Sequence, residues 1–267
     1  MRPIENTRPR AHVPAQRRTW VVSRLRAHGS VTVAELEREF GVSAMTARRD
    51  LDALERDGRV QRTHGGAIAA SMARREESFR VRLEQAAGAK ERLGAVVAER
   101  LEDGEAIFVD SSTTAFVALR HAIALGRRLT VLTNSIPVMD LLTQNDAPNV
   151  SLIGLGGALR KVTWSFVGPQ TIDGIDRHYA DKVLFSVNGI GDDGTLTEAD
   201  PLEAESKSAM IRRSEQVLLL ADGSKFERPG LTAIASPEAL TAAYVADADE
   251  EQLARLRDRN VNVEVVA

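Results

Sequence analysis

Two kinds of hydrophobic pattern alternate along the C-terminal part of the chain. Short runs rich in Val, Ile and Leu have the length of a buried strand, and between them apolar residues recur every three or four positions, as on one face of a helix. The expected strands span residues 106–110, 129–133, 150–154, 182–187, 216–221, 242–246 and 261–266. The expected helices span residues 89–101, 114–124, 136–142, 202–213 and 249–259. This alternation predicts an α/β fold with an open, largely parallel sheet.

A second pattern, over residues 15–69, predicts a compact helical module. The expected helices span residues 17–28, 33–40 and 44–57. Gly41 would make the turn before the last helix, since glycine readily adopts the positive φ of a tight turn, and Thr32 and Ser43 would cap helix N-termini. The segment 60–69, with glycines in its middle, predicts a β-hairpin wing.

The last of these three helices has two distinct faces. Ala47, Leu51 and Leu54 recur at helical spacing and would be buried, whereas the adjacent Arg48 and Arg49 point outward. Two helices joined by a tight turn, the second presenting arginines, form the geometry that places a helix in the major groove of DNA. The sequence therefore predicts a winged helix-turn-helix, although any small three-helix bundle would share its core positions.

The composition is that of an ordinary soluble globular protein. The chain has 267 residues, of which 43% are hydrophobic and 27% charged, and a formal net charge of −3. It has no cysteine, which excludes disulfides, thiolate metal sites and cysteine nucleophiles. We find no apolar run long enough for a transmembrane helix and no apolar stretch typical of a signal peptide. We therefore expect a cytoplasmic protein, and the length suggests two domains.

The charge is divided unevenly between the two parts of the chain. Residues 1–75 contain 15 Arg, no Lys and 8 Asp or Glu, a net charge of +7, whereas residues 76–267 have a net charge of −10. A basic N-terminal segment on an acidic body favours a module that binds a polyanion such as nucleic acid. The alternative is an arginine-rich surface that is simply solvated.

A run of hydroxyl residues follows the first strand of the expected sheet. Asp110, Ser111, Ser112, Thr113 and Thr114 leave this strand and open the next helix. Consecutive backbone N–H and side-chain O–H donors at a helix N-terminus form a ready anion site. One of these residues could act as an ordinary N-cap, but four hydroxyls exceed what a cap needs. The run therefore favours an anion-binding site.

Polar residues and glycines also gather at or beyond the ends of the other expected strands. They are Thr133, Asn134, Ser135, Gly156, Gly157, Asn188, Gly189, Lys207, Asp222, Ser224 and Lys225. The carboxyl ends of parallel strands are where open α/β sheets bind ligands. Lys207 and Lys225 are two of only five lysines in a chain whose basic residues are mostly arginine. Their presence indicates that these positions require an ammonium group rather than a guanidinium group.

The N-terminal module resembles a known family. Residues 31–36 and 40–55, with 58–67 as the wing, are similar to the signature of DeoR-type bacterial transcriptional regulators, with Ala47 where the family usually has Ile or Val. The resemblance implies binding to double-stranded operator DNA. The residues that would contact DNA are Thr32, Ser43, Met45, Thr46, Arg48, Arg49, Arg62 and His64. For His64 a role as a turn residue is equally open.

Residues 88–247 resemble the C-terminal effector domain of the same family. The family usually has Asp-Ser-Gly-Thr-Thr at the first loop, and here Ser112 replaces the glycine. The resemblance implies a fold similar to ribose-5-phosphate isomerase, a phosphorylated sugar as effector at the strand-end residues named above, no cofactor or metal, and a homodimer or homotetramer. The expected organisation is a disordered arm over 1–14, the winged helix-turn-helix over 15–69, a linker over 70–87 and an effector-binding and oligomerisation domain over 88–267.

The favoured function is a transcriptional repressor of a carbohydrate-catabolism operon, released by a sugar phosphate. The alternative is a sugar-phosphate isomerase fused to a DNA-binding module, with Glu203, Glu205 or Asp222 as general base. The isomerases of this fold carry an acidic run where this chain has residues 186–190, and Asn188 cannot act as that base. We therefore expect no enzymatic activity. A constitutive architectural DNA binder would leave the polar strand ends unexplained.

Overall fold

The computed structural model describes residues 14–28, 30–56, 60–63, 65–69, 78–144, 147–227 and 229–267. Its contacts divide the chain into two compact units, Met1–Arg75 and Glu76–Ala267, which are treated separately below. The expected disordered arm, apart from Pro14, and residues 70–77 of the expected linker lie outside the described residues, as does His64. Among the described residues, no helix is long and apolar enough to cross a membrane.

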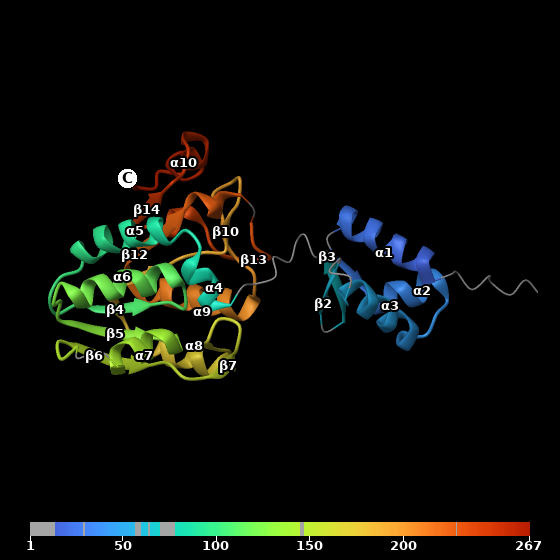
Figure 1. Cartoon of the computed structure of the whole chain (residues 1–267), viewed down its shortest axis with the longest axis horizontal. Helices are drawn as coiled ribbons and strands as arrows, with labels where there is room; N and C mark the ends of the chain where they lie inside the picture. The colour runs from blue at the N-terminus through green and yellow to red at the C-terminus, as the bar shows by residue number, and fades with distance from the viewer. Residues whose placement is uncertain are drawn as a thin grey trace, which may run out of the picture. The chain divides into compact units, whose positions relative to one another are not determined.

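The N-terminal unit is the predicted winged helix-turn-helix (Figure 1). Its elements are α1 (Pro14–His28), β1 (Ser30–Thr32), α2 (Val33–Phe40), α3 (Ala44–Arg56), β2 (Val60–Thr63) and β3 (Gly66–Ala69). The three strands form an antiparallel sheet in the order β1-β3-β2. A side chain at Gly66 would collide with the backbone oxygen of Val31, because its Cβ would lie 2.0 Å away, so this close approach requires glycine.

The turn and caps of this unit follow the sequence prediction. Gly41 has φ +63 at the end of α2, and Ala47, Leu51 and Leu54 are buried on α3. Thr32 caps α2 in a capping box, since its hydroxyl accepts a hydrogen bond from the Glu35 backbone N–H at 3.1 Å. The Glu35 carboxylate accepts in return from the Thr32 backbone and lies beside Arg24, and these contacts lower the pKa of Glu35 to about 2.

The C-terminal unit is built on a seven-stranded parallel sheet. The strands are β4 (Ala106–Val109), β5 (Leu129–Thr133), β6 (Val150–Gly154), β9 (Ala180–Phe185), β12 (Ser214–Asp222), β14 (Ala242–Ala246) and β15 (Val263–Val266). Their spatial order is β15-β14-β12-β9-β4-β5-β6, and every pairing is parallel. All seven correspond to strands predicted from the sequence, so the predicted open α/β sheet is confirmed.

Helices cover both faces of this sheet. They are α5 (Ala87–Glu99), α6 (Thr113–Ala124), α7 (Ile136–Gln144), α8 (Pro169–Asp176), α9 (Pro201–Arg212) and α10 (Glu250–Arg257). One core packs α5, α6 and α7 against one face, and a second core packs α8, α9 and α10 against the other. Figure 1 shows α5 and α6 side by side on the near face. Successive β4 residues alternate between the cores, with Ile107 in one and Phe108 in the other.

The chain order places a topological switch point between β4 and β9. From β4 the chain proceeds through β5 to β6 toward one edge, and from β9 it proceeds through β12, β14 and β15 toward the other. The loops that leave the carboxyl ends of β4 and β9 therefore turn away from each other and open a crevice. Open α/β sheets bind ligands in this position.

Several short elements were not expected from the sequence. They are a hairpin of β7 (Ala158–Arg160) and β8 (Ser165–Val167), the helix α8, the 3-10 turns η1 (Gly223–Phe226) and η2 (Pro237–Ala239), and an antiparallel sheet of β10 (Gly189–Ile190), β11 (Leu196–Glu198) and β13 (Thr232–Ala235). The strands among them have two to four residues each, which is too short to show a hydrophobic period, and β13 is held by pairing with β11, which is distant in sequence.

The expected linker over 70–87 includes residues that belong to the C-terminal unit. Residues Phe79–Glu84 form a further helix, α4, which belongs to the C-terminal unit. The Phe79 ring is buried and meets Phe116 of α6 edge-on, with ring centroids 5.5 Å apart. One aromatic residue in a charged segment is enough to dock this turn of helix, which the sparse apolar pattern did not indicate.

Candidate functional site

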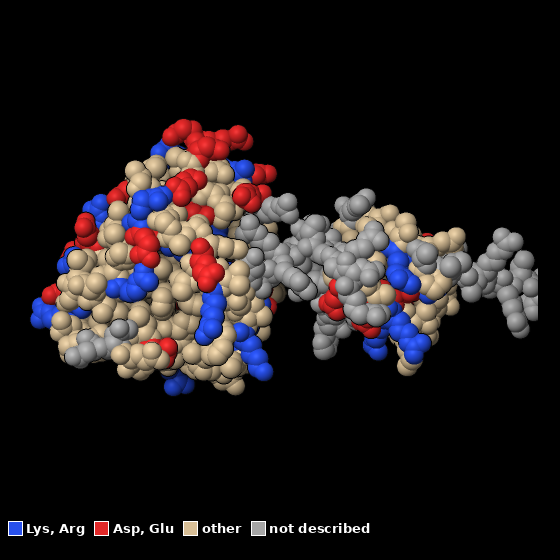
Figure 2. Space-filling model, in the orientation of Figure 1, with Lys and Arg blue, Asp and Glu red and all other residues tan. Residues whose placement is uncertain are grey.

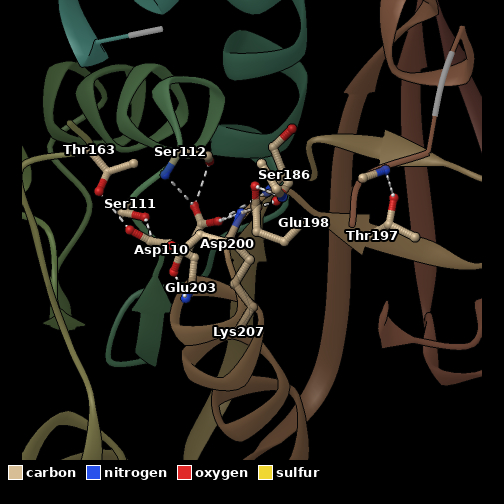
Figure 3. A network of polar contacts seen from close by, with 12 residues as sticks. Asp110, Ser111, Ser112, Thr163, Ser186, Thr197, Glu198, Asp200, Glu203 and Lys207 are labelled. Carbon is tan, nitrogen blue, oxygen red and sulfur yellow. Dashed lines mark hydrogen bonds and ion pairs between the residues drawn. The ribbon is translucent and has the colours of Figure 1, made fainter. Parts of the chain in front are cut away.

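A buried ammonium group lies at the switch point. The Lys207 Nζ atom, rising from α9, is 2.6 Å from Glu198 Oε2 and 3.1 Å from Asp110 Oδ2, and it donates a hydrogen bond to the Ser186 carbonyl oxygen at 2.6 Å (Figure 3). Burial opposes the charged forms, but the ion pairs outweigh it: they raise the pKa of Lys207 and lower the pKa of Glu198. The predicted residues Asp110 and Lys207 are thus brought together, and Glu198 and Ser186 complete their surroundings.

Glu203 lies beside this cluster with its carboxylate fully engaged. It accepts hydrogen bonds from the Ser111 hydroxyl at 2.9 Å and from the Thr163 hydroxyl at 2.6 Å, and the Ser165 hydroxyl donates to the same oxygen as Thr163 (Figure 3). Arg160 Nη1 is 3.9 Å from the same oxygen. This pattern holds a buried carboxylate in place through hydroxyl donors from two separate segments, the loop after β4 and the β7–β8 hairpin.

The hydroxyl run at the start of α6 has a divided role. The Ser112 hydroxyl caps α6 by accepting from the Ala115 backbone N–H at 3.2 Å and donates to Asp110, and Ser111 is occupied by Glu203. The Thr113 hydroxyl donates to the Arg82 carbonyl oxygen at 3.5 Å. Three of the four hydroxyls therefore have acceptors within the protein, which corrects the expectation that the whole run serves an anion. The groups that remain at the helix N-terminus are the backbone N–H groups of Thr113 and Thr114, which have no intrahelical acceptor.

Cationic side chains gather beside this helix N-terminus. Lys90 of α5 is buried, and its pKa falls to about 8 because of burial and the charges of Lys225 and Arg82, against which Asp222 acts. The charges of Lys225 and Arg82 thus act on the buried Lys90 ammonium, and gathering like charges in this way is costly without an anion beside them. The predicted Lys225 is thus part of a cluster that also contains Lys90 and Arg82. Lys90 is another of the five lysines of the chain, so the scarcity of lysine could have identified it as a candidate site residue in the sequence.

Three buried polar atoms beyond the strand ends lack hydrogen-bond partners. They are Asn134 Oδ1, Ser135 Oγ and Ser186 Oγ. Asn134 is fixed through its amide Nδ2, which donates to the Phe166 carbonyl oxygen at 2.8 Å, so its oxygen is presented in a defined direction. An unsatisfied buried polar group costs about 1–3 kcal/mol, which a ligand hydroxyl at the same place would recover.

Other predicted residues have structural partners instead. A side chain at Gly157 would come within 2.2 Å of the Thr171 hydroxyl, and that hydroxyl donates to the Gly156 carbonyl oxygen at 3.0 Å. Gly157 therefore admits α8, whereas a Cβ at Gly156 would meet nothing within 4 Å. The backbone of Asn188 and Gly189 is used by Thr197 in the small antiparallel sheet. Thr133 and Ser224 are tied into their own turns: the Thr133 hydroxyl donates to the Val109 carbonyl oxygen, and the Ser224 backbone N–H donates to Asp222.

The N-terminal unit presents a polar face on α3. Met45 is 66% exposed, Arg48 and Arg49 are exposed, and Ser43 caps the helix by accepting from the Thr46 backbone N–H at 3.3 Å. The carboxylates of Asp50 and Glu35 bind Arg17 at 2.6 Å and Arg24 at 3.0 Å. The Thr32 hydroxyl is engaged in its capping box, and the side chain of Arg62 lies outside the described residues.

The visible face of the C-terminal unit has no comparable concentration of one charge. Figure 2 shows Lys and Arg interspersed with Asp and Glu over this face. Among the residues that the structure describes, no three His, Asp or Glu side chains are grouped so that they could hold a metal ion. The chemically distinctive groups of this unit are therefore those of the β4–β9 crevice.

Two family models match the chain. One, described as a DeoR-like helix-turn-helix domain, covers residues 17–73, and the other, described as a DeoR C terminal sensor domain, covers residues 85–247. The glycerol-3-phosphate regulon repressor of Escherichia coli strain K12 is 32% identical over 229 residues, which are 86% of this chain and 89% of the relative. The L-fucose operon activator of the same organism is 30% identical over 242 residues, or 90% and 97% of the two chains.

Among solved structures, ribose 5-phosphate isomerase A from Neisseria gonorrhoeae aligns with the fold. The alignment covers 52% of this chain and 52% of that chain, with a TM-score of 0.38 and 12% identity. This is the enzyme that the family resemblance implied as a fold relative. A likeness of this size has no bearing on the chemistry of the crevice.

Replacing Lys207 with Met tests whether the crevice depends on its buried ammonium. Two carboxylates, Asp110 and Glu198, would be left buried without their counter-ion, so the free energy of unfolding should fall by roughly 3–5 kcal/mol. Urea unfolding of the ligand-free protein measures this loss. Lys161→Met, at an exposed lysine, is the control and should change stability by less than about 0.5 kcal/mol. A Lys207→Met variant as stable as this control would contradict the assignment.

Proposed function

Because the chain belongs to the DeoR family of transcriptional regulators, we propose that it represses a carbohydrate-catabolism operon and leaves its operator when a phosphorylated sugar binds in the β4–β9 crevice. The observation that carries the effector part is the cluster of Lys90, Lys225 and Arg82 beside the N-terminus of α6. Cations and unpaired backbone N–H groups at one point suit a phosphate dianion.

The rest of the crevice suits the sugar part of such an effector. The unpaired Asn134 Oδ1 atom accepts hydrogen bonds, and the Ser135 and Ser186 hydroxyls can donate or accept them. Sugar hydroxyls both donate and accept, so they match this set better than an apolar ligand would. One relative is named for glycerol 3-phosphate, which combines a phosphate with hydroxyl groups.

We propose repression as the direction of regulation. One relative is named a repressor and another an operon activator, and both cover most of this chain. The same DNA-binding unit serves either direction, because the outcome depends on where the operator lies relative to the promoter. We further propose that the protein acts as a dimer, since two recognition helices bind two half-sites one helical turn apart.

We propose that the effector is bound without being converted. The candidate bases of an isomerase are badly placed: Glu203 accepts from three hydroxyl groups, Glu205 is exposed on the outer side of α9, and Asp222 caps η1 through the Ser224 backbone. A general base needs a free lone pair directed at the substrate carbon. The crevice therefore favours a sensor over an isomerase.

Arg48→Ala and Arg49→Ala test the recognition helix. Each change should weaken operator binding by roughly 1–3 kcal/mol if the side chain pairs with a base edge. A contact to phosphate alone would instead reduce the salt slope by about one unit without changing sequence preference. The operator is first selected from random duplexes, and affinities are measured by fluorescence anisotropy at several salt concentrations.

Arg212→Ala is the matched control for this experiment, since Arg212 is an exposed arginine of the C-terminal unit. It should bind the operator as the wild type does. If both α3 variants also bind like the wild type, α3 is not the recognition helix.

The effector proposal predicts a pH dependence through Lys90. Its pKa is about 8 in the free protein, whereas a phosphate monoester is already dianionic above about pH 7. The dianion binds the ammonium form, so affinity should be steady near pH 7, fall as pH rises through 8, and be accompanied by proton uptake. Calorimetry in buffers of different ionisation enthalpy measures both quantities for glycerol 3-phosphate, ribose 5-phosphate and glucose 6-phosphate.

Three variants complete the effector experiment. Lys90→Met should bind the sugar phosphates more weakly and without this pH dependence. Lys225→Ala and Thr113→Val should also lose affinity. The control, Lys161→Met, should bind as the wild type does. An effector at a hundredfold excess over Kd should stabilise the wild type by about 2.7 kcal/mol, and the unphosphorylated sugars should not. A response to free sugars, or one that survives all three changes, would refute this site.

The absence of turnover is tested with the effector in deuterated water. The purified protein should give no deuterium incorporation beside the carbonyl and no aldose–ketose interconversion above the protein-free rate, because no free carboxylate faces the substrate carbon. Proton NMR follows both events. Deuterium incorporation that is lost in the Glu203→Gln variant would show instead that the protein acts as an isomerase.

A further inference from the structure

The short helix α4 is attached to the effector crevice through the same groups that are proposed to bind phosphate. The Arg82 carbonyl oxygen, at the end of α4, accepts hydrogen bonds from Lys90 Nζ and from the Thr113 hydroxyl at 3.5 Å, and Lys90 also donates to the Gln85 carbonyl oxygen at 2.6 Å. Lys90 has three N–H donors and Thr113 one O–H donor. An anion that recruits the Thr113 hydroxyl must therefore take it from α4.

The side chain of Arg82 has unused binding capacity in the same place. Its Nε and Nη2 atoms are buried and have no hydrogen-bond partner. Its charge acts on Lys90 and on Glu198, so the guanidinium lies near both the cationic cluster and the Lys207 network. Nε and Nη2 are the two donors on one edge of a guanidinium, and this edge forms the bidentate fork that binds phosphate and carboxylate oxygens.

The other end of α4 is anchored without involving the crevice donors. The Phe79 ring packs against Phe116, and the Phe79 backbone N–H donates to the Val162 carbonyl oxygen at 3.2 Å. In sequence, α4 is the first helix after residues 70–77, which join the two units. A change in the bonds that hold α4 therefore acts on the chain at the point where it enters the C-terminal unit.

We propose that Arg82 binds the phosphate of the effector through its Nε–Nη2 edge, and that the effector thereby exchanges the bonds that hold α4. In the free protein α4 is held by Lys90 and Thr113. In the complex it is held by Arg82 through the ligand, while Lys90 and Thr113 turn toward the phosphate. This inference rests on the proposed function and names the segment through which effector binding alters DNA binding.

The experiment compares Arg82→Met with Arg80→Met, a neighbouring exposed arginine of the same helix. Glycerol 3-phosphate and inorganic phosphate are the probes, and calorimetry gives their affinities. Arg82→Met should bind them about 10- to 100-fold more weakly, the range expected for loss of charge-assisted hydrogen bonds. Arg82→Lys, which keeps the charge but not the fork, should recover only part of this loss, and Arg80→Met should bind as the wild type does.

Hydrogen exchange supplies a readout that a merely electrostatic role would not change. In the wild type, glycerol 3-phosphate should alter the exchange of the amides of residues 79–85, and in Arg82→Met at saturating probe this change should disappear. The probe should then also change the operator affinity of Arg82→Met less than it changes that of the wild type. The Arg80→Met control should retain both responses.

The outcomes separate the two proposals. If the wild type binds the probe and releases its operator, and Arg82→Met does the same with unchanged affinity and unchanged exchange in residues 79–85, the role of Arg82 is refuted and the proposed function stands. If neither probe binds the wild type, both proposals fail together.

Discussion

The crevice of the C-terminal unit depends on one buried ammonium group. Lys207 is the shared counter-ion of Asp110, which follows β4, and Glu198, which ends β11, and it also binds the carbonyl oxygen of Ser186 beyond β9. An isolated charge in this position would be costly, so each partner must be present for the others to remain ionised. The loops that leave β4 and β9 are therefore joined by electrostatics beyond the last backbone pairs of these two strands. A rigid crevice of this kind exists before any ligand arrives.

The remaining charges divide the crevice into two parts of different character. Around Lys207 and Glu203 the carboxylates are neutralised or satisfied by hydroxyl donors, so this part offers hydrogen bonds but no net charge to a ligand. Around Lys90 positive groups predominate, with Asp222 as the opposing charge. A ligand with an anionic end and a hydroxylated body matches both parts in one orientation. The carboxylates of Asp110, Glu198 and Glu203 are engaged by Lys207 and by hydroxyl donors, so they serve to hold the crevice together.

The sequence predicted the parts of this structure that local patterns encode. The central strands of the parallel sheet are buried on both faces, so they appear as continuous apolar runs, and the polar residues after β4 and β5 were found because strand ends are defined by those runs. The strands β7, β8, β10, β11 and β13 have only two to four residues each and leave no such pattern. Lys90, Arg82 and Glu198 come from elements outside the sheet, and their convergence is a tertiary property. Gly157 shows a further limit: glycine signals a close approach, but the sequence could not tell that Thr171, rather than a ligand, approaches.

Regulation by such a site is constrained by the free energy that the effector can supply. A hundredfold change in operator affinity requires a coupling free energy of about 2.7 kcal/mol. Two or three hydrogen bonds between charged groups, at roughly 1.5–3 kcal/mol each, exceed this amount, but only bonds that differ between the two states of the protein contribute to coupling. Bonds between the effector and the Lys207 region form equally in both states. They therefore contribute to effector affinity and not to the coupling free energy. Lys90 and Thr113 are different, because they are bonded to the end of α4 when the site is empty. The groups that can exchange partners lie at the cationic end of the crevice. Under the proposed function, the phosphate of the effector, rather than the sugar attached to it, is therefore the part best suited to control DNA binding.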